Sequence, residues 1–283
     1  MITKALQNKI DYSINLIQKA EPLALQYSDN GFRLAFSGGK DSQVLYELAK
    51  MAGVKFVAEM QVTTVDPPEL MAFVRKNYPD VKLNRPKINM YDLIRKKKSL
   101  PRQKIRYCCY YLKELSGAGT VTLLGIRAAE SPRRKKRNEF EISSNKFSGT
   151  IDQFNNDKEK LITCVKGRDK ILLSPIFHWS DYDVWNFIKE LKLSYCELYD
   201  KGKKRIGCMF CPMTSPKQKR KDLINYPKVA QAYKKAIQYC IDNYGYCNDY
   251  SSDADEIFTC WINNRGFKSM PYTRLQTKIN FEK

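Results

Sequence analysis

One short stretch of the sequence decides the fold: Arg33-Leu34-Ala35-Phe36-Ser37-Gly38-Gly39-Lys40-Asp41-Ser42. Its first four residues are mostly apolar and predict a buried strand. From Ser42 to Met51 apolar side chains recur at helical spacing, so a loop joins this strand to a helix. Gly38 and Gly39 allow a tight turn that exposes backbone N–H groups, and the helix points its positive end at the same place. We therefore expect the loop to bind phosphate groups.

The side chains of this loop fit the same interpretation. Ser37 and Ser42 offer hydroxyl donors, and Lys40 offers a positive charge. Asp41 suits an anion site only when Mg²⁺ lies between its carboxylate and the phosphates. The spacing matches neither the Walker A loop nor the dinucleotide-binding Gly-x-Gly-x-x-Gly pattern. The alternative is an ordinary strand–turn–helix connection without a ligand.

Strands and helices alternate on both sides of the loop. The pattern predicts strands at residues 55–61, 81–83 and 121–125, and helices at 2–26, 67–77, 91–98 and 107–115. Pro22 is expected to kink or end the first helix. Because consecutive parallel strands need a crossover helix, this alternation predicts an α/β fold with a doubly wound, mainly parallel sheet.

The second half of the chain has a different pattern. Residues 130–170 are polar with weak periodicity, and we expect a long excursion with a hairpin that pairs 161–165 with 171–174. Helices are predicted at 180–191, 222–243 and 253–263. We therefore expect an N-terminal helix at 1–30, a nucleotide-binding α/β domain at 31–178 and a smaller, mainly helical lobe at 179–283.

The composition excludes several classes of protein. No run of about 18 apolar residues occurs, so a membrane span is not expected. The N-terminus soon turns polar, which argues against a signal peptide and for a cytoplasmic location. Nine cysteines in a reducing compartment indicate metal binding or catalysis rather than disulfides. His178 is the single histidine, which excludes most Cys–His catalysis and any zinc site with two histidines.

The chain is strongly basic, with 50 Lys and Arg against 30 Asp and Glu and a net charge of +20. The charge is clustered at residues 95–98, 133–137, 203–205 and 217–221. Such a field attracts polyanions, and nucleic acid (DNA or tRNA) is the partner we expect. The run 133–137 is a candidate substrate clamp. The alternative is a lysine-rich, solvated surface.

Four cysteines form a two-plus-two set, Cys108-Cys109 and Cys208-x-x-Cys211. Thiolates suit both zinc and iron–sulfur clusters. Adjacent cysteines chelate a single tetrahedral ion poorly because their side chains diverge, whereas a larger cluster accommodates them. Zinc, or two buried cysteines beside an unrelated zinc knuckle, remain the alternatives. We expect the other five to be mostly small core residues: Cys164, Cys196, Cys240, Cys247 and Cys260.

The segment Ser37–Ser42 resembles the PP-loop of ATP pyrophosphatases, which cleave ATP between the α and β phosphates. Further segments resemble the phosphoadenylyl-sulfate reductase branch of that superfamily, in order from about residue 33 to 213. They are Asp66-Pro67-Pro68-Glu69, Arg106-Tyr107-Cys108-Cys109-Tyr110-Tyr111-Leu112-Lys113, Gly125-Ile126-Arg127-Ala128-Ala129-Glu130-Ser131, Pro175-Ile176-Phe177-His178-Trp179, Asp183-Val184-Trp185 and Arg205-Ile206-Gly207-Cys208-Met209-Phe210-Cys211-Pro212.

The resemblance implies an adenine nucleotide alpha hydrolase-like fold that binds ATP or a related adenine nucleotide with Mg²⁺. It also implies a [4Fe–4S] cluster on the four cysteines. Lys40, Asp41, Arg127 and Glu130 are the expected catalytic residues, with Arg127 on a phosphate or sulfate and Glu130 on a metal or on Arg127. The alternative for these last two is a surface ion pair. Trp179 and Trp185 are expected in the core rather than stacked on a base.

The chain departs from the reductase pattern at its C-terminal end. Those reductases attack sulfur with a cysteine in a Glu-Cys-Gly-Leu-His type segment, whereas Cys260 here has no adjacent Gly or His. Relatives without that segment include the ATP-using subunits of DNA phosphorothioation systems. We therefore expect an enzyme that adenylates a substrate for sulfur transfer on nucleic acid, with a sulfur donor such as a cysteine desulfurase.

Two other functions remain open. One is a thiol-dependent reductase of phosphoadenylyl or adenylyl sulfate that forms sulfite. The other is a non-enzymatic nucleic-acid-binding protein with a structural metal site. No membrane partner is expected, and the sequence is compatible with oligomer formation.

Overall fold

The computed structural model describes residues 2–143, 147–156, 170–248 and 253–264. The chain forms two compact units. We call residues 1–61, 68–84 and 114–206 the sheet unit, and residues 62–67, 85–113 and 207–283 the helical unit. These units interleave along the chain, whereas the sequence predicts successive domains at 1–30, 31–178 and 179–283. That division stays a prediction.

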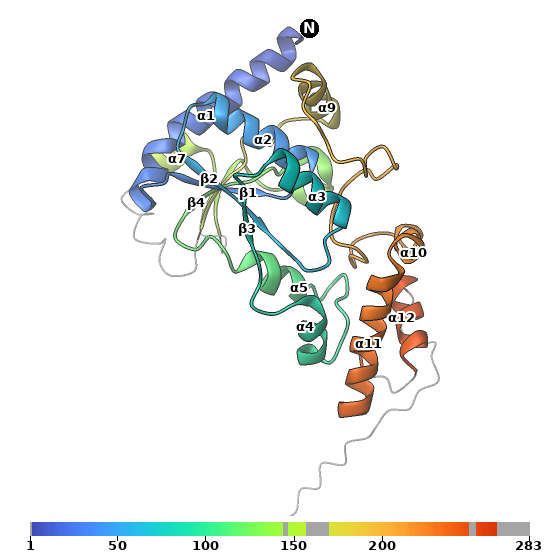
Figure 1. Ribbon diagram of the computed structural model, residues 1–283. Helices are drawn as coiled ribbons and strands as arrows, with labels where there is room; N and C mark the ends of the chain where they lie inside the picture. The colour runs from blue at the N-terminus through green and yellow to red at the C-terminus, as the bar shows by residue number, and fades with distance from the viewer. Residues whose placement is uncertain (1, 144–146, 157–169, 249–252, 265–283) are drawn as a thin grey trace, which may run out of the picture. The chain divides into compact units, whose positions relative to one another are not determined.

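A seven-stranded sheet forms the centre of the sheet unit, in the order β3-β2-β1-β4-β7-β5-β6 (Figure 1). The pairs among the first five strands of this order are parallel, and β5 is antiparallel to both β7 and β6. The predicted mainly parallel α/β sheet is confirmed. The strands are β1 (Phe32–Phe36), β2 (Phe56–Gln61), β3 (Lys82–Asn84), β4 (Val121–Leu123), β5 (Phe140–Ile142), β6 (Phe147–Gly149) and β7 (Ile171–Leu173).

Apolar side chains on the central strands and on the helices around them form one core. Leu34 of β1 lies opposite Ala58 of β2 and Leu123 of β4, and all three are buried. Buried and half-buried residues alternate along β1 and through most of β2, whereas all three residues of β4 are buried. The helices of this unit are α1 (Lys4–Tyr27), α2 (Lys40–Met51), α3 (Pro68–Asn77), the 3₁₀ turn η2 (Ala128–Glu130), α6 (Pro132–Lys135), α7 (Ile151–Asn156) and α9 (Asp181–Glu190).

Two sequence expectations for this unit need comment. Pro22 lies inside α1, which continues through it to Tyr27. The segment predicted as a polar excursion contains β5 and β6, which pair with each other as an antiparallel hairpin. The expected hairpin partner 161–165 lies outside the described residues, and β7 pairs with β4 and β5. Strands of three residues are too short to show a period of two in the sequence.

The helical unit contains a second core built around aromatic side chains. Phe210, Tyr233, Phe258 and Trp261 are buried there, with ring centroids 5.2–6.5 Å apart. Its helices are α4 (Met90–Lys97), α5 (Tyr107–Cys109) with the following π-helical segment η1 (Tyr110–Glu114), α10 (Pro216–Asn225), α11 (Pro227–Tyr244) and α12 (Ala254–Ile262).

The single helix predicted at 222–243 is wrong, because α10 ends at Asn225 and α11 begins at Pro227. Proline has no N–H to donate and disfavours helical backbone in the residue before it, so the break falls at Tyr226. None of the helices in the described parts of the chain is both long and apolar enough to cross a membrane.

Candidate functional site

The loop after β1 has the strand–loop–helix geometry that the sequence predicts. Gly38 has a left-handed φ of +70°. A Cβ atom there would lie 2.6 Å from Leu70 Cδ1 and 2.7 Å from Val74 Cγ2, both on α3. Only glycine satisfies both the backbone angle and this close packing. Gly39 has an extended conformation and caps the start of α2 without a side chain.

The two serines of the loop bond to each other and to its backbone. Ser42 Oγ donates to Gly39 O at 2.8 Å and accepts from the backbone N–H of Ser37 at 3.2 Å. Ser37 Oγ lies 3.2 Å from Ser42 Oγ. The serines therefore hold the shape of the loop, and the anion donors are its backbone N–H groups and the N-terminal end of α2.

Two residues distant in sequence complete the start of α2. Tyr199 accepts a 2.8 Å hydrogen bond from the backbone N–H of Lys40 at its hydroxyl. Burial is the main cause that raises the pKa of Tyr199 above its ordinary value, so this hydroxyl stays protonated and can donate to a ligand. Gly125 lies so close that a Cβ would be 3.2 Å from the Asp41 carbonyl. Sequence reasoning missed Tyr199, which carries no local motif.

A cavity of about 150 Å³ opens over the loop. Whole-ligand pockets usually measure about 300–1,000 Å³, so this cavity matches the phosphate part of a nucleotide rather than all of it. Its polar lining comes from Ser37, Gly39, Asp41, Ser42, Gly125, Glu130, Arg134, Tyr199 and Arg205.

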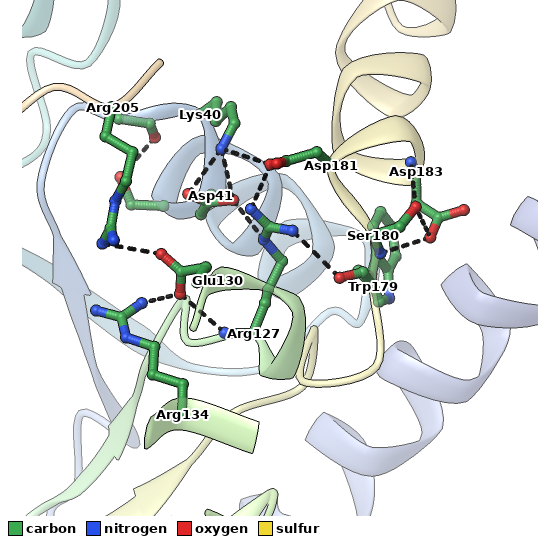
Figure 2. A network of polar contacts seen from close by, with 12 residues as sticks. Lys40, Asp41, Arg127, Glu130, Arg134, Trp179, Ser180, Asp181, Asp183 and Arg205 are labelled. Carbon is green, nitrogen blue, oxygen red and sulfur yellow. Dashed lines mark hydrogen bonds and ion pairs between the residues drawn. The ribbon is translucent and has the colours of Figure 1, made fainter. Parts of the chain in front are cut away.

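Behind the loop, two buried cations face two carboxylates (Figure 2). Arg127 is 1% exposed and donates from Nε to Asp41 Oδ1 at 2.7 Å, from NH2 to Asp181 Oδ1 at 2.6 Å and from NH1 to Trp179 O at 3.2 Å. Lys40 Nζ lies 3.3 Å from Asp41 Oδ2 and 3.1 Å from Asp181 Oδ1. The side chains of Lys40 and Arg127 therefore bind carboxylates, where the sequence interpretation assigns them to phosphate groups.

The electrostatics of Asp181 reflect this arrangement. Burial raises the pKa of Asp181, but hydrogen bonds from Lys40 and Arg127 outweigh it, and the net pKa lies below the ordinary value. The carboxylate is therefore ionised at neutral pH and holds both cations in place. Sequence reasoning also missed Asp181, although its position at the start of α9 is typical of an acidic residue near a helix N-terminus.

Glu130 organises the other side of the cavity. Its Oε2 accepts from the backbone N–H of Arg127 at 3.1 Å and pairs with Arg134, while its Oε1 lies 2.9 Å from Arg205 NH2. The Glu130 side chain is 5% exposed, against 31% for Arg134 and 59% for Arg205. Glu130 thus contacts the Arg127 backbone rather than its guanidinium, and it holds two arginines at the cavity (Figure 2).

Positive charge is crowded at this point. Burial, followed by the neighbouring Arg205 and Arg137, lowers the pKa of Arg134 to about 10. A bound anion would relieve this repulsion and strengthen both arginine contacts. The other members of the basic run differ, since Arg137 pairs with Glu141 whereas Arg133, Lys135 and Lys136 are exposed.

The four predicted ligand cysteines all belong to the helical unit. Cys108 and Cys109 form α5, and Cys208 and Cys211 precede α10. A hydrogen bond shared with Cys109, burial and the nearby Cys208 and Cys211 raise the pKa of Cys108. Burial first, and then Cys208 and Cys109, raise the pKa of Cys211. The four thiols therefore lie close enough for their charges to interact.

The four cysteines are the expected metal ligands of the helical unit. Among the described residues, no three His, Cys, Asp or Glu side chains are placed to hold one metal ion. Zinc needs its thiolates about 2.3 Å from one point, whereas a [4Fe–4S] cluster binds each thiolate at a different iron. The exposed Lys113 lies near these thiols, since Cys208 is the main cause that raises its pKa. The cluster itself stays a prediction.

Most of the remaining sequence expectations concern burial. Cys196, Cys240 and Cys247 are buried, as predicted, and Cys260 is half-buried on α12. Cys164 lies outside the described residues. Trp179 is 2% exposed and belongs to the core as predicted, and Trp185 packs against that core while partly exposed.

Comparisons with known proteins give the chain its relatives. Residues 31–214 match the model of the phosphoadenosine phosphosulfate reductase domain. An uncharacterized protein of Methanocaldococcus jannaschii is 28% identical over 216 residues, which are 71% of this chain and 46% of that one. The adenosine 5'-phosphosulfate reductase of Staphylococcus epidermidis is 26% identical over 209 residues, 68% of this chain and 74% of that one. The chain thus spans less than half the length of the first relative.

The chain also aligns with solved structures. The U34-tRNA thiolase NcsA from Methanococcus maripaludis, with its [4Fe-4S] cluster, aligns with a TM-score of 0.45 and 12% sequence identity. The alignment covers 84% of this chain and 79% of that chain.

Proposed function

Since the chain belongs to the phosphoadenosine phosphosulfate reductase domain family, we propose that it is a PP-loop enzyme that adenylates a substrate for sulfur transfer. The nucleotide is ATP or a related adenine nucleotide, and the acceptor is nucleic acid. The observation that carries the proposal is the small anion cavity, which combines the Ser37–Ser42 loop, the start of α2 and the pair Arg134 and Arg205.

In this proposal an oxygen of the acceptor attacks the α-phosphorus of ATP, and the bond to the bridging oxygen breaks. Pyrophosphate leaves with its charge stabilised by the loop N–H groups, Arg134 and Arg205. A persulfide from a sulfur donor such as a cysteine desulfurase then attacks the acceptor atom that bears the adenylated oxygen. AMP leaves with that oxygen, and a disulfide links the acceptor to the donor. A thiol reductant cleaves the resulting disulfide to leave sulfur on the acceptor.

Lys40, Arg127 and Asp181 act in this scheme as positioning residues for Asp41. Asp41 lines the cavity, and its carboxylate has lone pairs beyond those that face Lys40 and Arg127. Mg²⁺ is usually held by one or two carboxylates together with substrate phosphates, so Asp41 would fit it without a three-residue site. When bound, Mg²⁺ would neutralise developing charge on the phosphates.

The four cysteines Cys108, Cys109, Cys208 and Cys211 would hold the [4Fe–4S] cluster. When bound, the cluster would carry or relay sulfur, or stabilise the fold around it. Lys113 would offset part of the negative charge of the thiolates.

Nucleic acid is supported as the acceptor by charge. The net charge of +20 exceeds what a small adenylyl sulfate needs. Arg133, Lys135 and Lys136 are exposed on α6 or directly after it, next in sequence to Arg134 at the cavity. A phosphate backbone that contacts these three residues would lie close to the reacting phosphates.

A second candidate function is thiol-dependent reduction of an adenylyl sulfate to sulfite. The relative from Staphylococcus epidermidis that is 26% identical favours it. Such a reductase needs a cysteine nucleophile, and Cys260, half-buried on α12 among apolar residues, is the candidate outside the four-cysteine set. Release of sulfite in the presence of thioredoxin would support this function.

Arg205→Ala tests the proposed nucleotide site. We expect about tenfold weaker binding of Mg²⁺–ATP by calorimetry, because a charge-assisted contact is lost. Lys201→Ala is the matched control, since Lys201 pairs with the exposed Glu197 and does not line the cavity. If both variants bind Mg²⁺–ATP with the affinity of the wild type, the cavity is not part of the nucleotide site.

A further inference from the structure

A group of cations and tyrosines lies on the helical unit, outside the residues assigned above. Arg95 Cζ lies 4.8 Å from the ring centre of Tyr239, and Lys97 Nζ lies 5.0 Å from that of Tyr111. Lys98 Nζ lies 4.2 Å from the ring centre of Tyr244. We call these six residues the tyrosine–cation face. Three cations of one short segment thus lie over three different rings.

The backbone around this face is fixed by hydrogen bonds. Lys98 ends α4 in a left-handed conformation, and its carbonyl accepts from the N–H of Asn248 at 3.0 Å. The buried Asn248 accepts in turn from the N–H of Leu100 at 2.7 Å. Gly245, with φ +77°, ends α11 just after Tyr244. These contacts hold the last turn of α4 beside the end of α11, so the face is preorganised.

Charge and exposure leave this face available to a ligand. Lys96, Lys97 and Lys98 form no ion pair with any residue that the structure describes, and Arg95 pairs with Asp92. Tyr239 and Tyr244 are 40% and 39% exposed, and their rings meet edge to face at 6.3 Å. A role limited to packing α4 on α11 would leave this unneutralised charge unexplained.

We propose that the tyrosine–cation face binds single-stranded nucleic acid, which deepens the proposed function by naming a surface and a strandedness for its acceptor. Cations beside aromatic side chains suit a single strand, because the cations can pair with the phosphates and unpaired bases can stack on the rings. Duplex ends and grooves present few free base faces, so we expect duplex of the same sequence to bind more weakly.

Fluorescence anisotropy with a labelled oligonucleotide of about 16 nucleotides, the upper end of a single-domain site, tests the face. We expect Tyr244→Leu to weaken binding at least about fivefold and Tyr244→Phe, which keeps the ring, to leave it nearly unchanged. Lys97→Ala combined with Lys98→Asn should lower the log–log salt slope by about 1.4, since each lost contact to single strands removes about 0.7. Asparagine tolerates the left-handed backbone at position 98.

The matched control is Lys50→Ala with Lys55→Ala. It removes the same charge from the sheet unit, and Lys50 also lies over a tyrosine, Tyr46, which is only 6% exposed. We expect this control to keep the wild-type slope. Thermal melting of each variant separates a loss of contact from a loss of fold.

Several results would overturn the inference. If Tyr244→Leu binds the oligonucleotide with wild-type affinity, bases do not stack on this ring. If the Lys50 and Lys55 control lowers the salt slope as much as the Lys97 and Lys98 variant, the attraction depends on total charge rather than on this face. Polyglutamate or anionic vesicles bound as tightly as the oligonucleotide would point to an acidic protein or a membrane. ATP–pyrophosphate exchange, measured on the same preparations, separates the two proposals. If exchange occurs but binding does not depend on the Tyr244 ring, only the proposal for the tyrosine–cation face is wrong. If binding depends on the ring but no exchange occurs, only the proposed adenylation is wrong.

Discussion

Arg127 Nε and Asp41 Oδ1 lie 2.7 Å apart, with 1% of the arginine side chain exposed. The sequence interpretation assigns Arg127 to a phosphate or sulfate, and Asp41 to a Mg²⁺ beside the phosphates. Their mutual bond, with Asp181 on the other side of the guanidinium, instead makes Arg127 a support for the carboxylate that lines the cavity. In the proposed function, phosphate contact therefore falls to Arg134, Arg205 and the loop backbone, which line the cavity.

We therefore expect Arg127→Met to reduce the stability of the protein more than it reduces the affinity for substrate. Removing one partner of a buried ion pair leaves uncompensated charge, which typically costs about 3–5 kcal/mol, and the partial exposure of Asp41 and Asp181 places the expected loss near about 3 kcal/mol. Chemical denaturation measures it. Lys201→Ala, which breaks an exposed pair, should leave the free energy of unfolding nearly unchanged. Similar small losses in both variants would contradict the supporting role.

Lys219 gives the protein a pH dependence of stability in the alkaline range. Burial is the first cause that lowers the pKa of Lys219, from 10.5 to about 8. Between these two values the unfolded chain binds the proton that the folded chain has lost, so this group makes stability rise as pH increases from about 8 to 10.5. Lys219→Met should flatten that rise in denaturation midpoints measured across the window. An unchanged slope would show that Lys219 keeps its ordinary pKa.

Part of this site can be predicted from the sequence, and there is a physical reason why the rest cannot. The strand, loop and helix around Ser37–Ser42 are predictable because apolar periodicity and paired glycines are local signals. Tyr199 and Asp181 contact the start of α2 only because of the tertiary fold, and neither residue belongs to a sequence motif. The contact of Lys40 Nζ with Asp181 depends on the same tertiary arrangement.

The helical unit shows the same limit. The four cysteines are evident from their spacing, whereas the meeting of α4 with the end of α11 depends on Asn248, a buried left-handed residue in a loop. The helix break at Pro227 has a local cause, but the continuous apolar pattern across residues 222–243 outweighs it in the sequence interpretation.

The cysteine set predicts a visible cofactor. Protein isolated without oxygen should be brown and contain acid-labile sulfide, and Cys108→Ser or Cys211→Ser should lose both the colour and the sulfide. Cys196→Ser is the control, because this cysteine is buried in the sheet unit and is not one of the four predicted ligands. Stoichiometric zinc without sulfide would identify a single-ion site instead.

We expect the basic run 133–137 to serve two functions, and mutation can separate them. Replacing Arg133, Lys135 and Lys136 by Ala should lower the salt slope of nucleic-acid binding by about 2–3, at roughly 0.7–0.9 per lost phosphate contact, while ATP binding stays intact. Arg134→Ala should instead weaken ATP binding, because Arg134 lines the cavity. The same effect of both variants on ATP binding would contradict this division.

ATP–pyrophosphate exchange by protein purified without oxygen, with and without single-stranded DNA or tRNA, tests the central claim most directly. We expect the wild type to exchange pyrophosphate into ATP. Gly39→Val should lose exchange while it still folds, because a Cβ at Gly39 meets only Tyr199 Oη at 3.4 Å and Ser37 Oγ at 3.5 Å, whereas the branched methyl groups enter the cavity. No exchange with any acceptor, together with sulfite release from an adenylyl sulfate and thioredoxin, would contradict adenylation and establish the reductase.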